Sequence, residues 1–145
     1  MDDYEKYQKQ CKRIRAENER LLADFAAYLG TSGLSKKTVD NHVTNTAFYI
    51  NEYLLYEDAV PSKEGLHAVG VFFGYWFIKK AMWASQDSMR GTAASLKKFY
   101  TFLCSRGVVA QEDLTQLKET IKECMPDWLA SLSRWDDLSV DDVWE

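Results

Sequence analysis

Apolar residues recur at helical spacing from the start of the chain. Between residues 3 and 29 they alternate in three- and four-residue steps without an intervening glycine or proline, and polar Asn18 interrupts the series. Its members are Tyr4, Tyr7, Cys11, Ile14, Asn18, Leu21, Phe25 and Tyr28. This spacing is typical of a helix buried along one seam, or of a short coiled coil. Such a helix would be about 40 Å long, longer than a small bundle is wide. We therefore expect its first half to overhang the other helices or to meet another molecule.

The pattern continues through three more helical segments. Ser35 is the expected N-cap of a helix over residues 36–56, which turns Val39, Val43, Ala47, Ile50 and Leu54 inward. Residues 57–62 form a connector. The segment 63–83 has strand-like propensity in its centre, but its apolar residues form one helical stripe, so we predict a helix. A fourth helix begins near residues 85–88 and ends at Arg106-Gly107, a glycine C-cap.

Beyond Gly107 the pattern predicts two shorter helices and a tail. One helix covers residues 111–124, and the next begins at Pro126, because proline is favoured at the first helical position. The tail from Arg134 is acidic and carries Trp135 and Trp144. The sequence as a whole therefore predicts an all-α protein.

Composition narrows the class of protein further. A chain of 145 residues with 46% apolar residues can form one core, and three widely spaced cysteines predict no disulfide framework. The sequence contains no apolar run of membrane-spanning length and no signal-peptide pattern at its start. We therefore expect a soluble cytoplasmic protein. The net charge of −4 is uneven, at +3 through Arg106 and −7 from Gly107 onward.

Catalytic and cofactor chemistry find little support in the sequence. His42 and His67 lie far apart and no cysteine pair has ligand spacing, so we expect no metal site. We interpret His42 as a core or boundary histidine with its hydrogen bonds satisfied, and Cys104 as a buried small apolar residue. Phosphate-loop and nucleophile-elbow motifs are absent from the sequence. We expect neither an enzyme nor a bound cofactor.

Three segments together resemble a known family. They are Leu21 to Leu29, Gly33-Leu34-Ser35-Lys36-Lys37-Thr38 with the helix that follows, and Ser88 to Gly107, which contains Ala93-Ala94-Ser95-Leu96-Lys97-Lys98-Phe99-Tyr100-Thr101-Phe102-Leu103. Over residues 19–108 they resemble the N-terminal, SAM-like core-binding domain of phage integrases and other tyrosine recombinases. The resemblance implies a four-helix bundle that forms half of a clamp around duplex DNA. It divides the chain into an N-terminal helix overhang (1–18), the core-binding domain (19–108), and a C-terminal helical cap with an acidic tail (109–145).

The resemblance also implies which residues face DNA. They lie at and just inside two helix starts, and they are Ser35, Lys36, Lys37, Thr38, Asn41, Asn45, Ser88, Arg90, Lys97 and Lys98. The lysines and arginine would neutralise phosphates, the hydroxyls of Thr38 and Ser88 would donate to them, and the two asparagines would reach base edges. The same residue types are also ordinary capping and solvation residues at helix starts.

The chain departs from the recombinase pattern after Gly107. That part has no histidine, no tyrosine and a single arginine, Arg134, so no residue there can serve as the family's tyrosine nucleophile. The sequence thus predicts DNA binding without strand cleavage, with an optional homodimer through residues 4–18. The alternative is a helical protein–protein interaction module, which no longer binds DNA and which uses the heptad-like first helix or the acidic, Trp-bearing tail.

Overall fold

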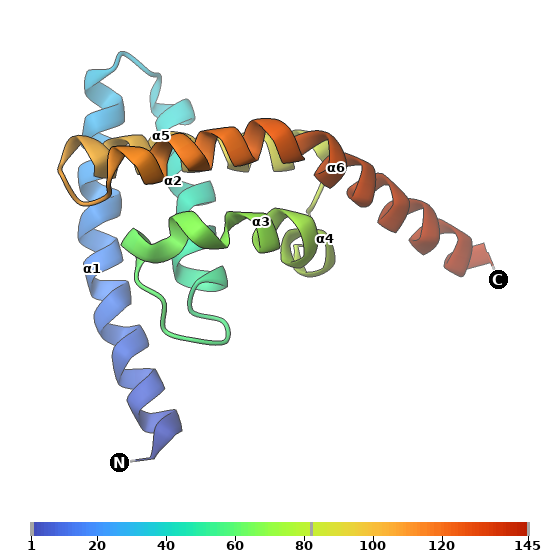
Figure 1. Cartoon of the computed structure of the whole chain (residues 1–145), viewed down its shortest axis with the longest axis horizontal. Helices are drawn as coiled ribbons and strands as arrows, with labels where there is room; N and C mark the ends of the chain where they lie inside the picture. Colours follow the sequence, from blue (N-terminus) through green and yellow to red (C-terminus); the bar gives the residue numbers. More distant parts are fainter. Residues whose placement is uncertain (1, 82, 145) are drawn as a thin grey trace.

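The computed structural model describes residues 2–81 and 83–144, with side chains described as far as Asp136. Within these ranges the chain is all-α and contains no strand. The helices α1, α2, α5 and α6 are the long elements, and a run of short helical segments lies between α2 and α5. Figure 1 shows α1 reaching beyond the other helices at its N-terminal end, and α6 doing so at its C-terminal end.

The first helix matches its expected span. Helix α1 (Asp3–Thr31) is capped by Asp2, whose side chain accepts from the backbone N–H of Glu5. Its seam faces the protein for most of its length, because Cys11 and Ile14 are buried against Leu55. Only the first turn or two overhangs, rather than the whole stretch up to residue 18.

The second helix begins where the sequence places it but changes its winding. Helix α2 (Lys36–Ala47) passes directly into the π-helical segment η1 (Phe48–Tyr53). A π-helical turn adds one residue to the turn, so it shifts which side chains face inward. Tyr49 and Ile50 are both fully buried there. Buried Asn18 of α1 donates to the carbonyl of Ile50 at 3.2 Å, which gives this polar seam residue a partner.

The segment predicted as one regular helix over 63–83 is helical but irregular. It consists of the 3₁₀ segment η2 (Ser62–Ala68), α3 (Val69–Val71), the π-helical segment η3 (Phe72–Trp76) and α4 (Phe77–Lys80). Two buried tyrosines anchor its start: Tyr49 donates to the carbonyl of Gly65 at 2.6 Å, and Tyr100 donates to the carbonyl of Ser62 at 2.8 Å. Burial raises the pKa of both tyrosine hydroxyls, so both remain donors at neutral pH.

Helix α5 (Gln86–Ser105) follows the prediction closely. Ser85 and Ser88 form a capping box at its start, and Gly107, at φ 74°, follows its end. Its buried stripe includes Met89, Leu96 and Leu103.

The two helices predicted after Gly107 are one helix, so that prediction is wrong. Helix α6 (Gln111–Trp144) continues through Pro126. An internal proline costs a helix about 3 kcal/mol, whereas each large apolar side chain buried on folding contributes about 1.5–3 kcal/mol. The buried apolar side chains of α6 lie on both sides of the proline and outweigh its cost; they are Leu114, Leu117, Ile121, Trp128 and Leu132. Helix α6 thereby covers α5 and the η2–α4 run.

Candidate nucleic-acid interface

Helices α2 and α5, which carry the predicted DNA-facing residues, pack directly against each other. The Nδ1 atom of His42 lies 2.8 Å from the Ser95 hydroxyl, and the side-chain amide of Asn45 donates to that hydroxyl at 3.0 Å. This meeting point lies seven residues after the α2 cap and ten after the α5 cap, or about 10 and 15 Å along the helices. The two helices therefore touch beyond their first turns as well as near their starts.

A groove connects the two first turns across this crossing. We call it the polar groove, and its lining residues are Thr38, Asn41, His42, Thr44, Asn45, Ser85, Asp87, Ser88, Gly91 and Ala94. Four of the ten predicted site residues are among them. Asn41 is exposed and free to reach a ligand, whereas the amide of Asn45 is already held by Ser95.

The predicted hydroxyl donors act within their own helices. Ser35 accepts from the backbone N–H of Thr38 at 3.2 Å, and its hydroxyl donates to that of Thr38 at 3.0 Å. Ser88 accepts from the backbone N–H of Ser85 at 2.8 Å as part of the capping box. These hydroxyls cap and stabilise the two helix starts, so capping hydrogen bonds already occupy them.

Lys36 and Lys37, the two lysines at the start of α2, lie outside the polar groove. The ammonium of Lys36 is 3.7 Å from the carboxylate of Asp40, one turn along the exposed face. Such exposed pairs contribute little to stability, but the carboxylate reduces the local positive charge. Asp40 thus offsets part of the positive charge at the start of α2.

Positive charge also gathers where α5 packs against α6. A second hollow brings Lys97, Lys98 and Lys118 together beside Ser32 at the end of α1. A third hollow, between α5 and α6, is lined by Arg90, Lys97, Lys118 and Lys122. We call these five cations the basic face: Arg90, Lys97, Lys98, Lys118 and Lys122.

The polar groove and the basic face form one continuous surface. The polar groove and the second hollow share Ala94, and the second and third hollows share Lys97 and Lys118. The ion pairs within the described part of the chain are Lys36–Asp40 and Arg106–Asp24, so no cation of the basic face has a carboxylate within 4.0 Å there. Asp87 in the polar groove is the acidic interruption on this surface.

Lys98 also lies near His42, the histidine where α2 and α5 cross, and affects its pKa. The pKa of His42 is lowered, first because the ring is partly buried and second because the ammonium of Lys98 is near. His42 is therefore neutral at pH 7 and is well placed to report on the charge around Lys98.

Sequence reasoning missed two members of the basic face, Lys118 and Lys122. Both were counted with the acidic C-terminal segment, which hid them in its negative balance. A signal was present, because the helical stripe of Leu114, Leu117 and Ile121 places residues 118 and 122 at the edge of the buried face. Once that stripe packs on α5, its neighbouring lysines join Arg90 and Lys97.

Other kinds of site receive no support from the residues that the structure describes. They contain no group of three or more His, Cys, Asp or Glu side chains placed to hold a metal ion. None of their helices combines the length and the apolar character that crossing a membrane requires. Trp135 is 40% exposed on α6, and the side chains of residues 137–145 lie outside the described residues. Comparison with protein-family models, with curated proteins and with solved structures finds no match to this chain.

Proposed function

We propose that this protein binds duplex DNA without cutting it, through the basic face and the adjoining polar groove. One observation carries the proposal: five cations from two helices line adjoining hollows and have no carboxylate partner among the described residues. Unpaired like charges on one surface repel each other, so their clustering favours a polyanionic ligand. The resemblance of residues 19–108 to the SAM-like core-binding domain of tyrosine recombinases points to the same class of ligand.

The positions of the side chains suggest which of them would contact phosphates and which would contact bases. Lys97, Lys98 and Lys118 surround one hollow and would contact successive phosphates of a strand. Asn41 in the polar groove would reach the base edges, because an exposed carboxamide can both donate and accept hydrogen bonds. Binding dominated by phosphate contacts would show strong salt dependence and weak sequence preference.

The test is fluorescence anisotropy of a labelled duplex at several salt concentrations. Each phosphate contact contributes a slope of about −0.9 to the plot of log affinity against log salt. Five contacts then weaken binding about 500-fold between roughly 50 and 200 mM salt. The triple variant Lys97→Gln, Lys98→Gln, Lys118→Gln keeps two contacts, so the same change in salt should weaken its binding only about 12-fold.

A matched control has the same change in net charge elsewhere. Lys6, Lys9 and Lys12 are exposed on α1, and Lys12 is about 24 Å along the helix from Tyr28, which lines the second hollow. Changing these three lysines to glutamine should leave the salt slope near that of the unmodified protein. Equal losses in both triple variants would mean that only net charge matters, and the absence of binding at low salt would refute the proposal.

A second candidate function is association through the N-terminal end of α1. Tyr4 is 66% exposed on the first turns of α1, which reach beyond the other helices (Figure 1). An exposed aromatic ring on a projecting helix suits a protein contact, including contact with a second copy of the chain. Sedimentation analysis of Tyr4→Lys against the unmodified protein tests it: a change of mass from dimer to monomer supports a homodimer, and a monomeric unmodified protein excludes one.

A further inference from the structure

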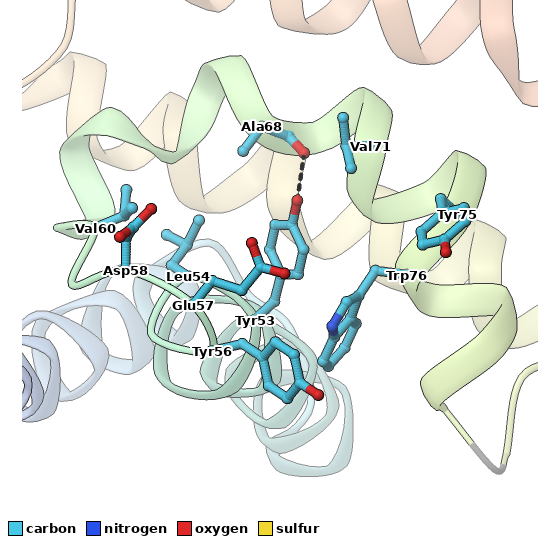
Figure 2. A pocket seen from close by; sticks show the side chains of 10 residues that line it. All are labelled: Tyr53, Leu54, Tyr56, Glu57, Asp58, Val60, Ala68, Val71, Tyr75 and Trp76. Carbon is cyan, nitrogen blue, oxygen red and sulfur yellow. Dashed lines mark hydrogen bonds between the residues drawn. The ribbon is translucent and has the colours of Figure 1, made fainter.

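A pocket lined by aromatic rings lies on the opposite end of η1 from the polar groove. It is a hollow of about 250 Å³ between the turn after η1 and the segment η3, shown in Figure 2. Its walls include Tyr53, Tyr56, Tyr75 and Trp76, and its acidic residues are Glu57 and Asp58. Neither the polar groove nor the basic face shares any of these residues.

The rings of the pocket walls meet at steep angles, edge to face. The centroids of Tyr53 and Trp76 are 5.2 Å apart at 64°, and those of Tyr56 and Trp76 are 5.7 Å apart at 69°. Aromatic faces carry partial negative charge and attract ammonium and guanidinium groups. The protein already uses this attraction beside the pocket, since the ammonium of Lys79 lies 4.0 Å from the centre of the Tyr75 ring. Lys79 itself does not line the pocket.

Negative charge completes the pocket. The carboxylates of Glu57 and Asp58 have no cationic partner within 4.0 Å in the described part of the chain. Glu57 lies close enough to Tyr53 to add to the effect of burial in raising the pKa of that hydroxyl, and Figure 2 shows its carboxylate turned toward the ring. The indole N–H of Trp76 is buried and has no acceptor among the described residues. An occupant that brings a cation would meet both carboxylates and the aromatic walls.

We propose that this pocket receives a lysine or arginine side chain from a partner protein. The charge of the side chain complements Glu57 and Asp58, and the apolar stem that carries the charge packs on the aromatic walls. The volume is below the roughly 300–1,000 Å³ of pockets for drug-sized ligands, and it suits a single side chain. Around the opening, Tyr56, Val71 and Tyr75 are 54%, 62% and 57% exposed, which extends the apolar surface beyond the reach of a small free cation. A protein surface would cover that rim.

The experiment follows the indole N–H signal of Trp76 by two-dimensional NMR. The probe is Nα-acetyl-lysine N-methylamide, and the matched control probe is the norleucine analogue, which has a similar chain without the charge. The signal is assigned with the variant Trp76→Phe. We expect the lysine amide to shift the Trp76 signal in a saturable way and the norleucine amide to leave it nearly unchanged.

Two carboxylate variants decide where the cation lies. Glu57→Gln should weaken binding of the lysine amide about fivefold or more, since the charge lies against the pocket. Glu52→Gln makes the same change in charge on η1 at an exposed residue outside the pocket, and it should bind as the unmodified protein does.

Three results would overturn the proposal. Equal shifts by the lysine and norleucine amides would show a merely apolar hollow, and equal behaviour of Glu57→Gln and Glu52→Gln would place the cation elsewhere. Tighter binding of tetramethylammonium chloride than of the lysine amide would make the occupant a small free cation instead of a protein side chain.

Discussion

Gly65 is the glycine at which an added methyl group would disturb the packing of the core most. It is buried in η2, and its carbonyl accepts the hydrogen bond of Tyr49. A Cβ added here would lie 2.8 Å from Cδ1 of Leu54 and 3.1 Å from Cε2 of Tyr49, and it would collide with the hydroxyl of Tyr100. All three neighbours are almost fully buried, and Tyr100 is held by its bond to the carbonyl of Ser62. None of them can move aside freely.

The expected cost of Gly65→Ala follows from these contacts. Overpacking of a filled core costs about 1–3 kcal/mol, and breaking the buried hydrogen bond of Tyr100 costs about 1–3 kcal/mol more. The better helical propensity of alanine offsets about 0.5–1 kcal/mol of this loss in stability. We therefore expect a net loss of about 3 kcal/mol in the free energy of unfolding. For a chain of this size, that lowers Tm by about 10 °C.

Gly70 provides the control for this measurement. It lies five residues further along the same helical run, and a Cβ built on it meets nothing within 4 Å. Gly70→Ala should therefore leave stability unchanged or raise it by about 0.5–1 kcal/mol. Urea and thermal unfolding followed by circular dichroism would measure both variants. Equal stability of Gly65→Ala and Gly70→Ala would refute the packing around Tyr100 described above.

Four further predictions concern other parts of the molecule. Because the pKa of His42 is lowered on folding, stability should fall as the pH drops through the unfolded value of about 6.5 and level off below the folded value; in His42→Gln the urea-unfolding free energy should lose this dependence. If phosphates neutralise Lys98, an NMR titration should show the pKa of His42 rising when duplex is added. Asn18→Ala should lower the free energy of unfolding by about 1–3 kcal/mol in urea, because it leaves a buried carbonyl of η1 without its donor. Pro126→Ala should raise Tm, since the helix continues through this exposed position and regains a backbone hydrogen bond; a lower Tm would show that the proline is needed there.

Periodicity predicted α1, α2 and α5 because their buried stripes are regular. The stripes that begin at Val39 and Met89 alternate at helical spacing, and Ser35 and Ser85 cap the helices that carry them. The π-helical segments could not be predicted from periodicity, because Tyr49, Ile50 and their aromatic neighbours could be buried by an α-helix or by a π-helix. Tertiary packing decides among these windings, and no local signal in the sequence records that choice.

The candidate site was only partly accessible to sequence reasoning. The sequence pattern correctly places Asn41 and Lys98 on two helices that pack together. It predicts, however, that the site is centred on the starts of these helices. The sequence pattern predicts a helix start at Pro126, which divides α6 and obscures how Lys118 and Lys122 line up with α5. Charge that comes together through packing cannot be found by counting along the chain.

The length of α6 has a geometric consequence. From Lys118 to its last helical residue the helix rises about 39 Å, and Figure 1 shows its C-terminal part projecting beyond the other helices. A continuous helix of this kind acts as a spacer arm of fixed length. Anything attached near Trp144 would be held about 40 Å along the helix axis from the basic face, or roughly one turn of duplex DNA. Binding at the basic face would thus fix the position of a second site at the far end of α6.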